Sequence, residues 1–219
     1  MDGELEIRFC DEVFLREHAE EFAVLCREAF AEHASRGVNM GPNTMTAEKF
    51  CDWAKGCVAE CLFAGEKLVG FWMARLDEKK KIAHGRILAV APGMKGRHLG
   101  TSLSLSLARA LREKGINVFI TDTSLKAPHV VAFHKSYGCK AVGMASWSNT
   151  NYYTVILRKA LSPEFEISDE EAEKRFRRSA FWCKLRLNED GTKTAFGWGV
   201  ALVLYPLRLA KRIAGRIVR

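Results

Sequence analysis

The stretch that most constrains this chain of 219 residues runs from Ala89 to Leu111, AVAPGMKGRHLGTSLSLSLARAL. An apolar run stops at Pro92, and a loop with glycines and cationic or imidazole side chains then leads into helix-forming residues. The pattern predicts a strand, a loop and a long helix in direct succession. A helix start has unpaired N–H groups and a partial positive charge, and glycine lets these groups approach a ligand. We therefore expect a phosphate or pyrophosphate here, although such turns are also glycine-rich for steric reasons.

The rest of the chain predicts a mixed sheet with helices on its faces. The run 116–123 is typical of a buried strand that pairs in parallel. Asp11 and Thr46 are suitable caps for two helices near the start of the chain. Further strands are expected at 4–10, 57–64, 68–76, 81–90, 139–147 and 151–161, and helices at 11–34, 46–53, 99–114 and 128–137. The predicted fold class is therefore α/β (α+β).

The loop before the expected helix 99–114 resembles the coenzyme A site of the GNAT superfamily of N-acetyltransferases. Members carry a V-x-P step followed by R/Q-x-x-G-x-G/A, and here VAP at 90–92 is followed by KGRHLG at 95–100. Gly100 matches this pattern, Lys95 replaces the arginine or glutamine, and His98 replaces the first glycine. A second motif, AFHKSYGC at 132–139, is similar to the helix that follows the fifth strand in the family. The resemblance covers roughly 4–161.

The resemblance implies a central sheet splayed between its fourth and fifth strands, with acetyl-CoA as co-substrate in the opening. The amine would attack the acetyl carbonyl directly, without a metal ion. The seven cysteines include no C-x-x-C pair, which favours buried free thiols over a metal site. The implied cofactor-binding residues are Leu88, Ala89 and Val90 for the pantetheine arm, and Lys95, Gly96, Arg97, His98, Leu99, Gly100 and Thr101 for the pyrophosphate.

Three side chains are candidates for proton transfer. By alternation, Ile82, His84, Arg86, Leu88 and Val90 are expected to share one face of their strand. His84 lies four residues before Leu88, where histone-acetylating members place a basic glutamate, and an imidazole titrates near neutral pH. A solvent-facing His84 is the alternative.

For the acid, His134 stands where many members use a tyrosine, and Tyr137 follows one helical turn later. A packing role for Tyr137 stays open. The loop SRGVNMGPNT at 35–44 is expected to form part of the acceptor wall. The side chains of Glu60, Trp72, Arg75 and Asp122 are further candidates to face the cleft.

The positive charge of the chain is concentrated at its C-terminal end. The net charge is +8, and residues 191–219 carry six cations and no acid, which leaves a net charge of +2 on the first 190 residues. Residues 206–219 predict a basic amphipathic helix, and the apolar run before it, 195–207, is too short to span a bilayer. We expect peripheral contact of 195–219 with an anionic membrane. A helix docked on the protein's own core is the alternative.

These observations predict an acetyl-CoA-dependent N-acetyltransferase that acts on a small-molecule amine, with an amino sugar or sugar nucleotide as one candidate. The expected domains are a GNAT-like domain at 1–161 and a C-terminal extension at 162–219. The chain begins without a cationic and apolar signal, so we expect a cytoplasmic location, with a peripheral position at the inner membrane surface left open. One rival is a CoA-binding or catalytically weak module tethered by its tail. The other is a nucleic-acid binder, which we do not expect because no such motif is present.

Overall fold

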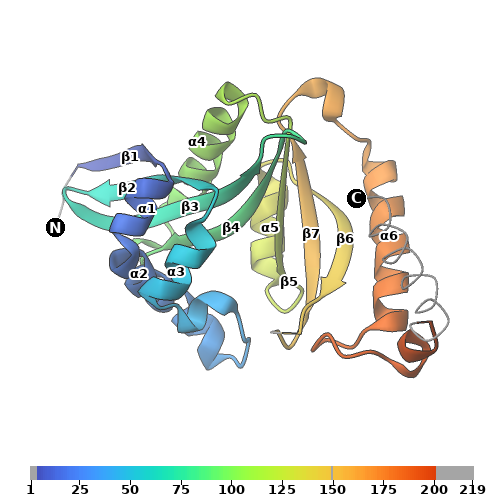
Figure 1. Ribbon diagram of the computed structural model, residues 1–219. Helices are drawn as coiled ribbons and strands as arrows, with labels where there is room; N and C mark the ends of the chain where they lie inside the picture. Colours follow the sequence, from blue (N-terminus) through green and yellow to red (C-terminus); the bar gives the residue numbers. More distant parts are fainter. Residues whose placement is uncertain (1–3, 149, 201–219) are drawn as a thin grey trace, which may run out of the picture.

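The computed structural model describes residues 4–148 and 150–200. Its centre is a seven-stranded sheet in the order β1-β2-β3-β4-β5-β7-β6 (Figure 1). The strands are β1 (Leu5–Cys10), β2 (Cys57–Ala64), β3 (Lys67–Asp77), β4 (Ile82–Val90), β5 (Val118–Ser124), β6 (Lys140–Ser146) and β7 (Tyr153–Ala160). The α-helices are α1 (Glu12–Glu17), α2 (Ala19–Ser35), α3 (Ala47–Ala54), α4 (Leu99–Glu113), α5 (Pro128–Ser136) and α6 (Asp169–Arg186).

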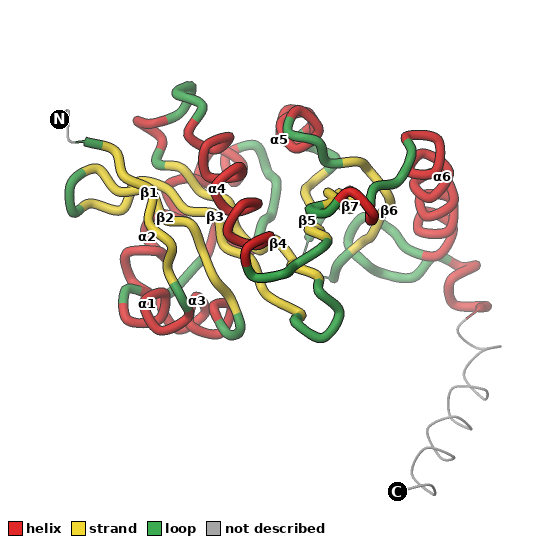
Figure 2. Tube along the Cα trace, turned by 90° about the horizontal axis from the view of Figure 1, so that it is seen from above, coloured by secondary structure: helices red, strands yellow, loops and turns green. Residues whose placement is uncertain are grey.

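The sheet separates in the middle, between β4 and β5. These two strands pair in parallel only from Ile82–His84 to Val118–Ile120, whereas every other neighbouring pair is antiparallel. Figure 2 shows β1 to β4 on one side of this opening and β5 to β7 on the other. The splayed mixed sheet expected from the sequence is confirmed.

Helices cover both faces of the first four strands. The face under α1, α2 and α3 is packed by aromatic side chains, including Phe22, which stacks on Phe50 at 4.9 Å between ring centroids. The opposite face lies under α4, whose Leu103, Leu107 and Leu111 are almost fully buried. Burial of apolar surface on both faces fixes β4 between two cores, and this holds the edge of the opening in place.

The structure corrects one helix boundary near the start of the chain. Asp11 caps as expected, because its side chain accepts a hydrogen bond from the N–H of Phe14. The helix then ends at Glu17 instead of continuing to residue 34, and α2 begins at Ala19. His18 has φ −102° and ψ 21°, outside the helical range, and its ring stacks on Phe14.

The region after β7 is partly described. The Ser168 side chain caps α6 by accepting from the N–H of Glu171, and α6 lies beside the edge strand β6 (Figure 1). In 4–148 and 150–200, no helix is both long and apolar enough to cross a membrane. The basic amphipathic helix expected at 206–219 lies outside the described residues.

Candidate active site

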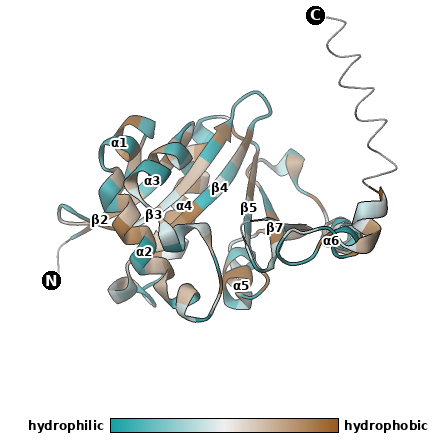
Figure 3. Ribbon diagram, turned by 60° about the horizontal axis from the view of Figure 1, so that its bottom comes forward, coloured by the Kyte–Doolittle hydropathy of each residue, from teal (hydrophilic) through white to brown (hydrophobic). Residues whose placement is uncertain are grey.

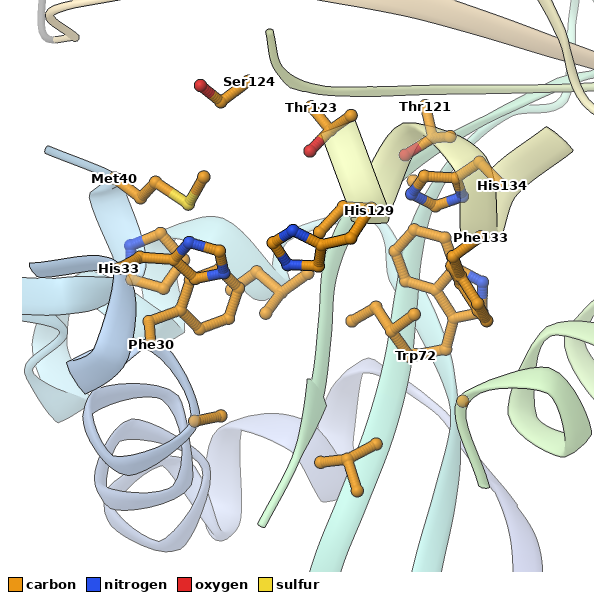
Figure 4. A pocket seen from close by; sticks show the side chains of 18 of the residues that line it. Phe30, His33, Met40, Trp72, Thr121, Thr123, Ser124, His129, Phe133 and His134 are labelled. Atoms are coloured by element: carbon orange, nitrogen blue, oxygen red, sulfur yellow. The ribbon is translucent and has the colours of Figure 1, made fainter. Parts of the chain in front are cut away.

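A cavity of about 1060 Å³ occupies the opening between β4 and β5 (Figure 4). One end is bounded by the loop before α4, with Gly96 and Gly100, and we call this the loop end. The other end is bounded by side chains such as Met40 and Tyr152, and we call this the aromatic end. The cavity therefore runs from a helix N-terminus, through the split in the sheet, to a more apolar chamber.

The loop end is shaped by two left-handed residues. Gly96 has φ +80° and His98 has φ +57°, and His98 is the N-cap of α4, with no side-chain hydrogen bond to the helix. Left-handed residues are a common part of the backbone turns whose N–H groups bind an anion. The resemblance places a glycine at position 98. His98 takes the left-handed conformation that a glycine adopts readily, so the backbone at this position keeps a glycine-like shape.

The expected cofactor residues are mostly brought together. Ala89 is an exception, because it is buried in the core under α1 to α3. Arg97 is the other exception, since it is exposed and its Nη1 contacts the Met94 sulfur at 3.1 Å. The residues that do line the cavity are Leu88, Val90, Lys95, Gly96, His98, Leu99, Gly100 and Thr101.

Lys95 is held by an acidic side chain from α2. Its Nζ lies 3.1 Å from Oε2 of Glu32, and Arg36 contacts the other oxygen of the same carboxylate at 2.7 Å. A hydrogen bond from Lys95 holds the pKa of Glu32 below its usual value. The ion pair is exposed, so its contribution to stability is small. Lys95 can therefore exchange Glu32 for a phosphate at little cost.

A β-bulge in β4 overturns the expectation that five alternating side chains share one face. Ala74 and Met73 of β3 pair with Gly85 and Ile87, so Arg86 is an extra residue on β4. Ala83 consequently packs in the core under α4, whereas Ile87 packs in the core under α1 to α3. His84 therefore faces the side of α1 to α3, and Leu88 faces the side of α4.

His84 does not line the cavity. Partial burial lowers the pKa of His84, and the nearby charge of Asp77 acts in the opposite direction. Its position beside Arg75 of β3 lies where β4 and β5 are still paired, before the opening begins. The structure therefore does not bring His84 together with the other two candidates for proton transfer.

His134 and Tyr137 form one buried unit. His134 lines the cavity from α5 but is only 3% exposed, and burial lowers its pKa to about 4. Its Nδ1 is hydrogen-bonded to the hydroxyl of Tyr137, which does not itself line the cavity. Burial also raises the pKa of Tyr137. At neutral pH both groups are uncharged, and the imidazole stands between the phenol and the cavity.

Two loops meet to close the aromatic end. The N–H of Asn39 donates to Oδ1 of Asn151 at 3.1 Å, and Nδ2 of Asn151 donates to the carbonyl oxygen of Gly37 at 2.7 Å. Beneath this contact, Val38 and Met40 pack with Tyr152 and Ala127. The loop 35–44 therefore lines the cavity as the sequence predicts, and it spans the opening to reach the half of the sheet that holds β7.

Opposite charges flank the opening just beyond the last β4–β5 pair. Arg86 of β4 lies over the ring of Trp53 at 5.1 Å, and Asp122 of β5 lines the cavity on the other strand. Burial raises the pKa of Asp122, while the charge of Arg86 and a hydrogen bond with Trp147 act in the opposite direction. Asp122 and Trp72 were expected at the cleft and line it, whereas Glu60 and Arg75 do not.

Sequence reasoning missed a pair of histidines. His33 of α2 and His129 of α5 stack in parallel across the cavity, with ring centroids 5.9 Å apart and an interplanar angle of 4° (Figure 4). Burial lowers the pKa of His33, and the neighbouring His129 adds to this effect. The two residues are far apart in sequence, so no local pattern could have joined them. In the part of the chain that is described, no cluster of three metal-ligating side chains occurs.

The fold and the site define the class of the protein structurally: a splayed mixed sheet with a cavity in its opening and a helix that begins at one end of that cavity. The model of the acetyltransferase (GNAT) family matches residues 17–139. The chain belongs to this family and is an acetyl-CoA-dependent N-acetyltransferase.

Solved structures of low sequence identity share the fold. The PaiA N-acetyltransferase from Thermoplasma acidophilum in complex with coenzyme A is 17% identical, with 72% of this chain and 99% of that chain covered and a TM-score of 0.58. YncA of Salmonella typhimurium, a putative acetyltransferase with its cofactor acetyl-CoA, is 13% identical, with 76% and 99% covered and a TM-score of 0.57. The ribosomal-protein-S18-alanine N-acetyltransferase from Escherichia coli is 13% identical, with 75% and 100% covered and a TM-score of 0.55. No curated protein matches the sequence.

Proposed function

We propose that this enzyme transfers the acetyl group from acetyl-CoA to the amine of a small molecule inside the cavity between β4 and β5. The observation that carries the proposal is the edge of β4. Beyond His84 this edge has no pairing with β5, and it runs through Leu88 and Val90 directly to the start of α4. Unpaired strand edges bind extended chains through backbone hydrogen bonds, which suits a pantetheine arm.

The loop end would hold the pyrophosphate. The N–H groups at the start of α4 and the two left-handed residues Gly96 and His98 offer a concave set of donors. Lys95 would leave Glu32 and contact a phosphate, whose charge is larger than that of a carboxylate. The peptide groups of 95–101 supply most of this site, so the side chains at 97 and 98 matter less than their backbone.

The His134–Tyr137 unit would return a proton to the departing sulfur. The amine nitrogen attacks the acetyl carbon, a C–N bond forms, and the C–S bond breaks to give a thiolate. If the Tyr137 hydroxyl donates to Nδ1, then Nε2 of the neutral imidazole bears hydrogen. The thiolate takes that proton while Nδ1 receives one from Tyr137, and the proton that the amine nitrogen loses on attack then returns to Tyr137 through the imidazole. The role of His84 as base stays a prediction, and its position outside the cavity does not support it.

A small acceptor fits the closed aromatic end, because the contact between Asn39 and Asn151 bridges the opening there. An amino sugar or sugar nucleotide stays a prediction with no observation in its favour. The test is calorimetric titration with acetyl-CoA and with free CoA, followed by thiol release in the presence of an amine panel. A catalytically weak binding module would give heat without thiol release, and absence of heat with either ligand would reject the cofactor site.

We also propose that the C-terminal extension, residues 162–219, makes peripheral contact with an anionic membrane through residues 195–219 while 1–161 carry out catalysis. The described part of the extension exposes four aromatic side chains. Figure 3 shows α6, which carries two of them, at the end of the molecule far from β2. The exposed fractions are 62% for Phe181, 42% for Trp182, 46% for Phe196 and 57% for Trp198. Cationic groups stand over two of these rings, Arg186 over Trp182 and Lys193 over Trp198. Exposed aromatic rings beside cations suit the interface of an anionic bilayer.

Vesicle flotation tests this contact. The full chain should float with vesicles that contain anionic lipid and not with neutral vesicles, and Phe181→Ser with Trp198→Ser should reduce the bound fraction. Leu105→Ser, at an exposed position on α4, is the matched control. Equal binding by all variants would reject the contact.

All seven cysteines are free thiols, which supports a cytoplasmic location.

A further inference from the structure

Arg86 and Asp122 are the strongest unexplained feature of the cavity. The last parallel pair of the sheet joins His84 to Ile120, and Arg86 and Asp122 come two residues later on their respective strands. They therefore flank the first step of the opening, one on each side. Both line the cavity, and no ion pair or side-chain hydrogen bond of Arg86 to another side chain or backbone oxygen occurs within 4–148 and 150–200. Two opposite charges thus share a cavity without contacting each other.

The guanidinium of Arg86 is oriented by its neighbours. Trp53 of α3 provides the ring on which it rests, and Trp53 is in turn fixed against Gly41, where a Cβ atom would approach the ring to 2.7 Å. Stacking on an aromatic face leaves the planar edge of the guanidinium free to donate to another group. That edge carries a fork of N–H donors that matches the two oxygens of a carboxylate.

Asp122 is placed to receive a cation. Its carboxylate lies at the aromatic end, where it also raises the pKa of Tyr152 in addition to the effect of burial on that residue. An ammonium group bound there would pair with this carboxylate. The remaining walls of this end are aromatic or apolar, with Phe30, Met40 and Trp147 among them.

We infer that the acceptor belongs to the amino-acid class: its amine lies close to a carboxylate, which Arg86 binds, its ammonium faces Asp122, and its apolar or aromatic body fills the aromatic end. The inference rests on the proposed function, because it requires acetyl-CoA in the same cavity. The protons balance in this arrangement. Of the three protons on the ammonium, one leaves through Asp122 before the attack and one stays on the amide nitrogen. The third is lost during the attack and replaces the proton that the thiolate takes from the His134–Tyr137 unit.

The first experiment compares two amines that differ only in the carboxylate, phenylalanine and phenethylamine. The expected kcat/KM is at least about tenfold higher for phenylalanine, because a charge-assisted hydrogen-bonded pair stabilises binding by about that factor. In Arg86→Met the ratio should fall to about 1. Arg75→Met is the matched control, because Arg75 lies exposed on the adjacent strand outside the cavity, and it should keep the wild-type ratio. Asp122→Asn should lower kcat/KM for both amines and leave the ratio unchanged.

A second experiment does not depend on turnover. N-acetylphenylalanine and N-acetylphenethylamine are titrated calorimetrically into the CoA-loaded enzyme, and the carboxylated compound should bind at least about tenfold more tightly, an advantage lost in Arg86→Met. Equal affinity for the two compounds, no binding of either, or an unchanged advantage in Arg86→Met would overturn the inference. Failure of CoA itself to bind is a different result, and it would reject the proposed function on which the inference rests.

Discussion

The two ends of the cavity are built in different ways. At the loop end, one continuous stretch from Leu88 to Thr101 supplies nearly every group, and most of these groups belong to the backbone. At the aromatic end, side chains converge from α2, α3, β4, β5, α5 and two loops, and none of these segments forms the site alone. The loop end depends on backbone shape, whereas the aromatic end depends on side-chain identity.

This difference has a chemical reason. A pyrophosphate is recognised well by N–H groups, which every residue except proline provides, so the side chains there can vary while the conformation is kept. Proton transfer and discrimination between amines need particular side chains at particular points. Substitutions at the aromatic end should therefore change rates strongly, while those at the loop end should matter only when they alter the backbone.

The largest expected effect separates two histidines of the cavity, one expected to act through its side chain and one through its backbone. His134→Ala removes the imidazole that contacts Tyr137 and lines the cavity, and we expect kcat to fall about 100-fold, a typical loss for a general acid. His98→Asn keeps a residue type that tolerates the left-handed conformation, so KM for acetyl-CoA should change less than about threefold. Steady-state thiol release measures both. A His98→Asn defect as large as that of His134→Ala would break the comparison.

The buried imidazole of His134 also predicts a dependence of stability on pH. Its pKa is lowered to about 4 in the folded protein, against about 6.5 in the unfolded chain. Between these values the unfolded state binds a proton that the native state does not, so stability is complete above pH 6.5 and is lost as the pH falls. The full difference is roughly 3 kcal/mol.

Urea unfolding at pH 7 and pH 5 measures this loss, and His134→Gln is the control. The substitution can change stability at pH 7, so the relevant quantity is the difference between the two pH values in each protein. A wild-type difference no larger than that of His134→Gln would show that the imidazole titrates normally, contrary to its burial.

The same contrast explains which features could be predicted from the sequence. The loop end follows from contiguous residues, and so do the caps at Asp11, Thr46 and Ser168, because each depends on neighbours within a few positions. The stacked pair of His33 and His129 could not be predicted, since it depends on where two distant helices pack.

The bulge at Arg86 is an intermediate case. An isolated glycine inside a strand is a signal for a bulge, and Gly85 stood in the expected strand 81–90. The register with β3, which decides where the extra residue falls, is a tertiary property. The prediction of strict alternation therefore put His84 on the same face of the strand as Leu88. The extra residue Arg86 places these two side chains on opposite faces.

Gly85 gives the third prediction, because the core under α4 depends on its lack of a side chain. A Cβ atom there would lie 2.8 Å from Phe119, 2.8 Å from Trp72 and 2.9 Å from the hydroxyl oxygen of Thr121. We expect Gly85→Ala to reduce the free energy of unfolding by about 1–3 kcal/mol, the usual cost of overpacking. Denaturant unfolding measures the loss. Gly65→Ala would not serve as a control, because Gly65 has φ +62° and alanine would be strained there for a different reason. A neutral effect would show that the split in the sheet can widen freely.

The smallest effect tests whether the loop end is a backbone site. Gly96 and Gly93 both have open space where a Cβ atom would stand, but only Gly96 has a positive φ, +80°. Gly96→Ala should therefore raise KM for acetyl-CoA about fivefold, since a left-handed alanine costs roughly 1 kcal/mol, while Gly93→Ala should leave KM unchanged. Because neither methyl group meets another atom, a difference between the two variants can come only from the backbone. If both variants raise KM equally, the added methyl groups obstruct acetyl-CoA directly. The loop end would then bind the cofactor through surface contact at Gly93 and Gly96 as well as through its N–H groups.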